Sequence, residues 1–408
     1  MKLYLRLDKY FWILILLPLI FFFSSLFVYF AQDDFFLLHI SQVTNLNDLI
    51  TLFIPHPEVV WYRPLSSQIF FFISQSLFGL RPFLYHLMVM ATHLITTVIF
   101  FNLLLRLTKN RQLSFITAGF YSINQIHTVS ISWLATYSFI LGPLCLTAYI
   151  YYLYTKQYLK ADVSFLAGVL TTELFIVFTP LALFYDLLYR QPFDWWRYTK
   201  FMLISLVVII LRLVLFPTQL SSSLYTFSET SFLQMIKFYM LRLAGMPLLF
   251  DTLTPLLKLL IVIEVMVITG LLLIGVYSCI RNHIFLPRWI HLFLLTGGAG
   301  SIPFLLLPEH VAPYYVSFTL IGVAPIIIWF ILQVVPFVNS KQWLVICSLF
   351  LIGNIVGVYW TYQTHWIFRR AALAHNLIVE KEFEQVVGSE EYISLGAGAA
   401  AQVFKDEH

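Results

Sequence analysis

The chain has 408 residues, of which 60 % are hydrophobic, 18 % are aromatic and only 11 % are charged, and its formal net charge is +4. Its mean hydropathy is +0.85. A water-soluble fold of this size cannot bury so much apolar surface, so the composition excludes one and predicts an all-α polytopic membrane protein. The sequence has no Walker loop, no glycine-rich dinucleotide turn and no basic stripe, so we expect no nucleic-acid partner.

Basic residues predict which side of the membrane each end of a span faces. They cluster at the N-terminus, around Arg106–Arg111, at Lys156/Lys160, around Arg190–Lys200, at Arg281/Arg288 and at Lys341. The positive-inside rule places these clusters in the cytoplasm. It predicts eleven spans, with the N-terminus inside and the C-terminus outside. The apolar segments are 10–30, 83–105, 112–126, 133–154, 162–173, 174–189, 200–217, 258–280, 289–307, 314–336 and 342–362.

The segment 162–189 must cross the membrane twice if Lys160 and Arg190 both lie inside. Each leg then has roughly fifteen residues and reaches about 22 Å, which is less than the ~30 Å hydrocarbon core. We therefore expect either two short crossings or a re-entrant hairpin, with Glu173 at its apex. We expect the three cysteines, Cys145, Cys279 and Cys347, to be buried small hydrophobic residues rather than a disulfide framework.

The expected domain is a single membrane unit, 1–362, followed by a short external tail, 363–408. Its first outer loop, 31–82, carries an adjacent pair of acids. Two apolar stretches rich in polar side chains, 65–80 and 231–249, predict interfacial helices in the first and fourth outer loops. Most acidic, arginine and histidine side chains that could take part in a reaction fall on the predicted non-cytoplasmic face. This asymmetry is the main functional signal from the residues alone.

Asp33 and Asp34 directly follow the first span. A carboxylate can accept the proton of a hydroxyl as that hydroxyl attacks, and two adjacent carboxylates raise the pKa of one of them. The alternative is a helix cap or a solvated loop charge. The sequence leaves a divalent cation at this pair open. Two carboxylates are too few to define a metal site by themselves.

Two arginines and four other polar residues are further candidates. Arg63 offers a fork of donors suited to phosphate, and Arg212, within a span, could hold a lipid phosphate; the alternative for both is snorkelling at the interface. An acid at a hairpin apex is unlikely to face lipid, so Glu173 is either functional or a structural hydrogen-bonding group. Glu309, His310 and Tyr314 could bind sugar hydroxyls or form an interfacial aromatic belt.

Several stretches, taken together and in order, resemble one family. They are Tyr62-Arg63-Pro64-Leu65 with Leu77-Phe78-Gly79-Leu80 and Tyr85-His86-Leu87, the Asp33-Asp34 pair, Asn124–Trp133, Thr172-Glu173 with Tyr185-Asp186, and Glu309-His310 with Tyr314-Tyr315. The set is similar to that of GT-C integral-membrane glycosyltransferases of the protein O-mannosyltransferase-like and transmembrane/TPR O-mannosyltransferase-like kind. The chain differs from them at Asn124, Gln125, Val129 and Tyr137, and no TPR array follows.

The resemblance implies a GT-C-like fold and a polyprenyl-phosphate-sugar donor. The acceptor, a hydroxyl of a protein, lipid or glycan, would attack the anomeric carbon with inversion outside the cytoplasm. It further implies Asp33 as the base with Asp34 beside it. The donor phosphate would be held by Arg212, Arg63 or Arg242, and the sugar and acceptor cavity would be lined by Glu173, His127, Glu309, His310 and Tyr314.

Two other functions stay open. One is a flippase or transporter for a lipid-linked glycan, which needs polar groups at mid-membrane depth. The other is an inactive membrane subunit of a glycosylation complex, which the departures at 124, 129 and 137 favour. The expected location is an integral membrane protein of a bacterial plasma membrane, surrounded by membrane lipids and with its site on the outer face.

Overall fold

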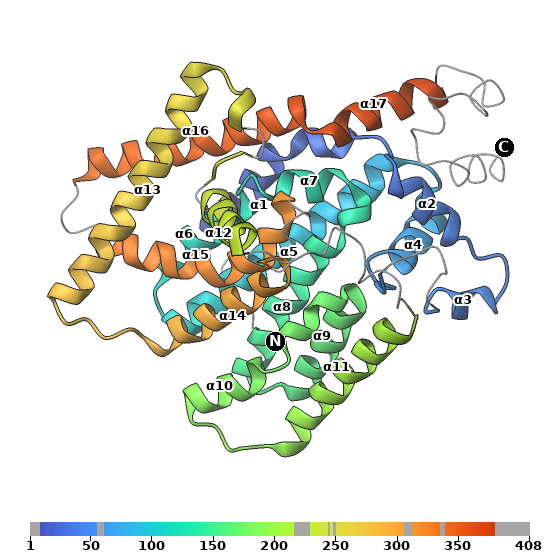
Figure 1. Cartoon of the computed structure of the whole chain (residues 1–408), viewed down its shortest axis with the longest axis horizontal. Coiled ribbons are helices and arrows are strands. Elements are labelled where there is room, and N and C mark those ends of the chain that lie inside the picture. Colours follow the sequence, from blue (N-terminus) through green and yellow to red (C-terminus); the bar gives the residue numbers. More distant parts are fainter. Residues whose placement is uncertain are drawn as a thin grey trace.

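The structure, a computed structural model, describes residues 9–54, 61–215, 229–243, 245–247, 250–305, 312–334 and 339–379. Within these ranges every regular element is a helix and there is no strand (Figure 1). The α-helices are α1 (Lys9–Phe21), α2 (Asp33–Ile40), α3 (Asp48–Thr51), α4 (Gln68–Phe78), α5 (Pro82–Thr108), α6 (Arg111–Ser122), α7 (His127–Ser132), α8 (Ser138–Tyr154), α9 (Tyr158–Thr171), α10 (Leu181–Tyr189), α11 (Trp195–Leu215), α12 (Glu229–Leu243), α13 (Pro255–Arg281), α14 (Arg288–Leu305), α15 (Ser317–Leu332), α16 (Ser340–Thr364) and α17 (Trp366–Val379). Short 3-10 turns are η1 (Phe23–Phe27), η2 (Leu134–Thr136), η3 (Glu173–Phe178), η6 (Phe250–Thr252) and η7 (Pro313–Val316).

Among the described residues, five helical stretches are long and apolar enough to cross a membrane. They are Pro82–Thr108, Leu134–Tyr154, Pro255–Arg281, Pro313–Leu332 and Ser340–Thr364. These stretches confirm the helical class and indicate a membrane-embedded protein. The finer expectation of eleven spans stays a prediction.

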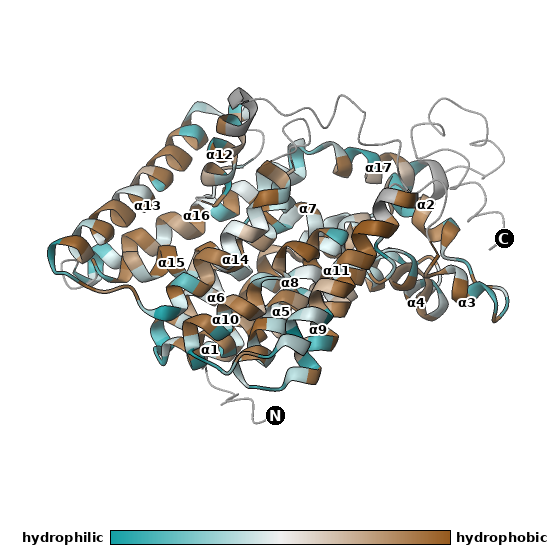
Figure 2. Cartoon of the chain, turned by 60° about the horizontal axis from the view of Figure 1, so that its bottom comes forward, coloured by the Kyte–Doolittle hydropathy of each residue, from teal (hydrophilic) through white to brown (hydrophobic). Residues whose placement is uncertain are grey.

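The main hydrophobic core lies where α5, α6, α8, α9, α14 and α15 meet, and α14 packs closely along α15. In Figure 1, α13 and α16 lie at one side of this bundle and α2, α3 and α4 lie at the opposite side. Large apolar side chains such as Leu206 and Ile210 on α11 and Met266 and Leu273 on α13 remain exposed. Figure 2 shows the same apolar character along these two helices. Such faces suit contact with lipid rather than water.

The expected hairpin is present as two short helices. α9 has 14 residues and α10 has 9, and the 3-10 turn η3 between them begins at Glu173. At a rise of 1.5 Å per residue, neither helix spans a ~30 Å core by itself. The break arises because Thr172 is extended and its side-chain oxygen accepts a bond from the N–H of Leu174, which starts a new turn. Glu173 thus lies at the turn, as predicted.

Other expected elements also form helices. α4 lies within 65–80, α12 overlaps 231–249, and α17 follows the last long helix in the tail. One expectation about the cysteines is wrong. Cys145 and Cys279 are buried, but Cys347 is exposed. It lies on α16, where apolar residues such as Leu344 and Val345 are also exposed, so apolar neighbours in the sequence do not by themselves place a residue in the interior.

The contact between α14 and α15 depends on glycine. A Cβ atom added at Gly322 would lie 2.1 Å from the backbone nitrogen of Gly297, whereas one added at Gly298 would meet no atom within 4 Å. Because backbone atoms cannot rotate away, we expect Gly322→Ala to destabilise the fold by about 3 kcal/mol. Gly298→Ala is the matched control and should be neutral or slightly stabilising. Apparent melting temperatures of the two variants in detergent check this, and equal values would contradict it.

Candidate functional site

The acidic pair begins the short helix α2. Asp33 and Asp34 occupy its first turn, where carboxylates interact favourably with the helix dipole. The residue before them, Gln32, has φ 49° and ψ −110°. This conformation is costly for any residue with a Cβ atom, by about 1–3 kcal/mol. Surrounding contacts therefore hold the entry to α2 in a strained conformation.

Asp34 joins two distant parts of the chain. It is 1 % exposed, its Oδ2 accepts a 2.9 Å bond from the N–H of Ala31, and its Oδ1 accepts a 2.7 Å bond from the N–H of Ala135. Burial raises the pKa of this carboxyl well above its ordinary value, and the two N–H bonds oppose that shift. The Asp34 side chain therefore fixes the start of α2 against the turn η2.

Asp33 has a different environment. It is partly exposed, and burial raises its pKa above the ordinary value. Tyr314, at the start of η7, lies close enough to Asp33 and to Arg63 to interact with the charges of both. Asp33 is therefore the acid of the pair that faces other polar side chains.

Arg63 and Glu173 form an ion pair at the turn of the hairpin. Arg63 Nε lies 3.1 Å from Glu173 Oε2, and Nη2 lies 3.3 Å from Oε1. The two side chains are 19 % and 15 % exposed. Two bonds hold the Arg63 segment in place: Leu65 N–H donates to the Leu170 carbonyl oxygen at 3.0 Å, and Ser66 donates to the Thr171 carbonyl oxygen at 2.6 Å. Burial lowers the pKa of Arg63, but the charge and hydrogen bond of Glu173, together with Tyr315 and Tyr314, outweigh burial and leave the pKa raised.

Aromatic rings surround this pair. The Arg63 guanidinium lies 5.5 Å from the ring centre of Trp61 and 6.0 Å from that of Phe139. The Tyr314 ring lies 4.8 Å from Phe139 and 5.0 Å from Tyr315. We call Asp33, Arg63, Glu173, Tyr314 and Tyr315 the acid–arginine cluster. Its members come from four segments far apart in sequence, so tertiary packing assembles it.

Sequence reasoning named Tyr315 beside Tyr314, but it did not identify Phe139 or Trp133 as residues of this site. Tyr315 interacts electrostatically with Arg63, and Phe139 packs against both tyrosines. Trp133 is 8 % exposed, its ring centre lies 6.5 Å from that of Tyr314, and its indole N–H has no hydrogen-bond partner in the part of the chain described. In an apolar sequence with 18 % aromatic residues, nothing distinguishes these rings from ordinary packing.

The other predicted site residues lie elsewhere or outside the described structure. His127 is fully buried, with its ring centre 4.6 Å from that of His93. Arg242 is 6 % exposed and donates a hydrogen bond to the Met246 carbonyl oxygen. Arg212 lies on α11, but its side chain is outside the described residues, as are Glu309 and His310 entirely.

The acidic pair does not fit a divalent-cation site. Both Asp34 oxygens already accept backbone N–H bonds, which leaves Asp33 as the one carboxylate of the pair that could bind a cation. No group of three His, Cys, Asp or Glu residues able to hold a metal occurs among the described residues. A cation held by Asp33 alone would need nearly all of its oxygen ligands from water or substrate.

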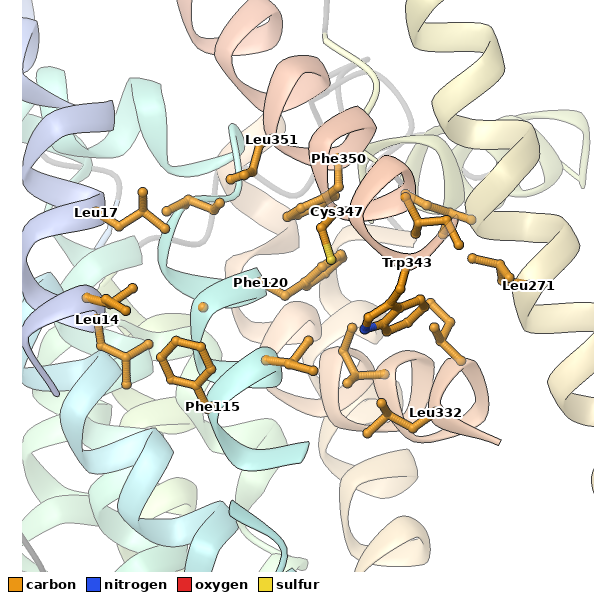
Figure 3. Close-up of a pocket in the computed structure, with 18 residues that line it drawn as sticks. Leu14, Leu17, Phe115, Phe120, Leu271, Leu332, Trp343, Cys347, Phe350 and Leu351 are labelled. Carbon is orange, nitrogen blue, oxygen red and sulfur yellow. The ribbon is translucent and has the colours of Figure 1, made fainter. Parts of the chain in front are cut away.

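A separate apolar cavity of about 240 Å³ lies between α1, α6, α13, α15 and α16 (Figure 3). Leu14, Phe120, Trp343, Cys347 and Phe350 are among the side chains that point into it (Figure 3). None of the residues of the acid–arginine cluster lines this cavity. Its chemistry suits a hydrocarbon chain.

The fold indicates a helical, membrane-embedded protein, and the site brings Asp33, Arg63 and Glu173 together with two tyrosines. Comparison of this chain with protein-family models, with curated proteins and with solved structures finds no match. The function is therefore argued from the site itself.

The Arg63–Glu173 pair should contribute measurably to stability. We expect a double-mutant cycle with Arg63→Met and Glu173→Gln to give a coupling energy of about 1 kcal/mol, since the pair has two hydrogen bonds but is partly exposed. The measurement is the free energy of unfolding, or the shift in apparent melting temperature, of wild type, both single variants and the double variant. Strictly additive effects would contradict a direct interaction. Lys200→Met with Asp162→Asn, an exposed pair, is the matched control.

Proposed function

We propose that the chain is a membrane glycosyltransferase. It transfers a sugar from a polyprenyl-phosphate-linked donor to an acceptor hydroxyl at the non-cytoplasmic face. The observation that carries this proposal is the acid–arginine cluster: a partly exposed carboxylate with a raised pKa faces a tyrosine that also adjoins a fixed guanidinium. In such a reaction a carboxylate can remove the proton of the acceptor hydroxyl, and a guanidinium can stabilise the negative charge of the leaving phosphate.

In the proposed reaction Asp33 is the general base. The acceptor oxygen attacks the anomeric carbon while Asp33 takes the hydroxyl proton. The bond between the anomeric carbon and the phosphate oxygen breaks, and the lipid phosphate leaves with the electron pair, so the configuration inverts. A carboxylate whose pKa is raised toward neutrality is a better proton acceptor than an ordinary one.

Arg63 is the proposed phosphate ligand. Its Nε and Nη2 are bonded to Glu173, and this geometry leaves the Nη1 edge of the guanidinium outside the pair. Donors fixed before the reaction stabilise developing charge without a cost of reorganisation. Glu173 is therefore assigned as a positioning residue for Arg63. Asp34 sets the direction of α2, and Tyr314, Tyr315 and Trp133 offer hydroxyl and indole groups to a sugar.

Arg242 is the less suitable of the remaining phosphate candidates, because its guanidinium binds the Met246 carbonyl oxygen. We keep Arg212 as a proposal. The proposal includes a GT-C-like arrangement of eleven spans in a bacterial plasma membrane, with the N-terminus inside and the donor among the membrane lipids. The apolar cavity of Figure 3 is suited to hydrocarbon of such lipids.

Two alternatives each have one supporting observation. An inactive subunit is favoured by the structural bonds of Asp34, whose two oxygens are both occupied. A flippase is favoured by Glu264, a buried acid on the long apolar helix α13. The glycosyltransferase has the stronger support because Asp33 and Arg63 converge on Tyr314.

The test is turnover by purified protein. Wild type in lipid nanodiscs is supplied with a panel of radiolabelled polyprenyl-phosphate sugars, and release or transfer of sugar is measured beside binding of the donor. We expect turnover of at least one donor. Binding without any turnover would support the inactive subunit, and movement of labelled lipid between leaflets without turnover would support the flippase.

A further inference from the structure

Glu264 is a buried acid with no hydrogen-bond or ion-pair partner among the described residues. It lies on α13, one of the five candidate membrane spans, and is 1 % exposed. Neither Oε1 nor Oε2 has a hydrogen-bond partner among the described residues. An acid inside a membrane span is energetically expensive and is retained where it has a function. The proposed glycosyl transfer does not use it.

Two glycines shape the space around this carboxyl. A Cβ atom at Gly353 of α16 would lie 1.4 Å from Glu264 Oε2, so any side chain there would exclude the acid. A Cβ atom at Gly245 would lie 3.2 Å from Oε1, and Gly245 has φ +94°, a conformation that favours glycine. The carboxyl therefore occupies a built recess between α13, α16 and the turn at 245–246.

The recess is tied to the rest of the fold by hydrogen bonds that do not involve the acid. Asn354 Nδ2 donates to the Phe350 carbonyl oxygen, and its Oδ1 accepts from Gln125 N–H, each at 3.0 Å. Gln125 Nε2 donates to the Met246 carbonyl oxygen at 2.9 Å. These neighbouring polar groups thus hydrogen-bond to one another or to the backbone, and none of them donates a hydrogen bond to the Glu264 carboxyl.

Charged groups on the elements packed around the recess do not pair with it. The basic ones are Lys258 and Arg281 on α13, Lys341 at the start of α16, and Lys237 and Arg242 on α12, and the Arg242 guanidinium binds the Met246 carbonyl oxygen. No ion pair within 4.0 Å joins Glu264 to any of them in the described ranges. A carboxylate with no counter-charge at such a site neutralises by taking up a proton.

We propose that Glu264 is a proton-binding site inside the membrane domain, a neutral carboxylic acid whose ionisation loosens the contact of α13 with α16 and with the turn at 245–246. The folded state holds a proton here that the unfolded state releases at neutral pH. Stability must therefore fall as pH rises toward the ionisation of Glu264, because the folded state binds the extra proton. This inference does not rest on the glycosyltransferase proposal.

The first test is infrared spectroscopy of the full-length protein. We expect wild type to show a carbonyl band of a protonated carboxylic acid that is absent from Glu264→Gln. Asp33 and Asp34 are present in both proteins and cancel in the difference spectrum. Asp251→Asn is the matched control, since Asp251 is an exposed acid on the neighbouring turn η6, and this variant should keep the band. A Glu264→Gln spectrum identical to wild type in this region would show an ionised Glu264 and overturn the proposal.

The second test follows stability with pH. The apparent melting temperature of wild type should fall more steeply between neutral and alkaline pH than that of Glu264→Gln, while Asp251→Asn should follow wild type. Parallel curves for wild type and Glu264→Gln would overturn the coupling to folding.

If Glu264→Gln fails to fold, wild type alone remains informative. A hydrophobic carbodiimide adds the carboxyl oxygen to its central carbon while the acid proton passes to its nitrogen. The adduct rearranges to a stable N-acylurea that retains every atom of both reactants. We expect peptide mass spectrometry to find this adduct at Glu264, less of it as pH rises, and none at exposed Asp48. An unmodified Glu264 would overturn the proposal.

Discussion

Replacing Asp33 with asparagine is expected to reduce sugar transfer by about 10²–10⁴-fold while the protein still inserts, folds and binds donor lipid. Asparagine keeps the size of the side chain but cannot accept a proton from the acceptor hydroxyl. Asp33 makes none of the backbone bonds that hold Asp34, so the fold does not depend on its charge. The measurement is turnover of the donor that wild type uses, together with donor binding.

The sign of the pH effect follows from the raised pKa. Burial raises the pKa of Asp33 in the folded protein, so its ionised form opposes folding at pH values above the unfolded pKa. Asp33→Asn should therefore be as stable as wild type or more stable at neutral pH. In wild type, activity should fall as pH drops through the raised pKa of the base, and the residual activity of the variant should lack this acidic limb.

Two outcomes would count against this assignment. Turnover of Asp33→Asn equal to wild type would exclude Asp33 as the base, and loss of both folding and turnover would make it a structural residue. Asp251→Asn serves as the control, because it removes an exposed carboxylate from the neighbourhood of α13 and should leave turnover unchanged.

Asp34→Ala is expected to have the opposite profile, with a large loss of stability. The change removes both acceptors and leaves the N–H groups of Ala31 and Ala135 buried without a partner. Each unsatisfied buried donor costs about 1–3 kcal/mol, so we expect a loss of about 2–6 kcal/mol. Asp34→Asn keeps one acceptor oxygen and should lose about half as much.

Asp33→Ala is the matched control for Asp34→Ala, since it makes the same chemical change one position earlier. Apparent melting temperatures of the three variants, measured on purified protein in one detergent, give the comparison. An Asp34→Ala protein as stable as Asp33→Ala would mean that Asp34 does not hold α2 against η2.

Local patterns in the sequence were sufficient for several helices. Polar side chains within the apolar stretches 65–80 and 231–249 predicted helices, which are present as α4 and α12. The charges on both sides of 162–189 and its short legs predicted the hairpin that turns at Glu173. The acidic pair was identified because a charge beside the first span is rare in a chain with 11 % charged residues. These features depend on neighbouring residues and on the thickness of the membrane, so a sequence can reveal them.

The different roles of Asp33 and Asp34 could not be predicted from local sequence patterns. Asp33 and Asp34 are identical and adjacent, and only the N–H of Ala135, 101 residues later, distinguishes them. The Arg63–Glu173 pair likewise joins residues 110 positions apart. The aromatic rings around them carried no separate signal, because apolar packing and a binding surface use the same residue types.

By itself, the sequence determined that this protein is helical, apolar enough for a membrane and acidic just after its first apolar segment, because composition and period are local properties. The tertiary structure alone decided which acid is held by backbone bonds, which arginine is fixed by a partner, and that Glu264 lies in a recess between glycines. Such facts depend on distances between segments far apart in the chain. A membrane chain with few charges does not specify those distances through any local pattern.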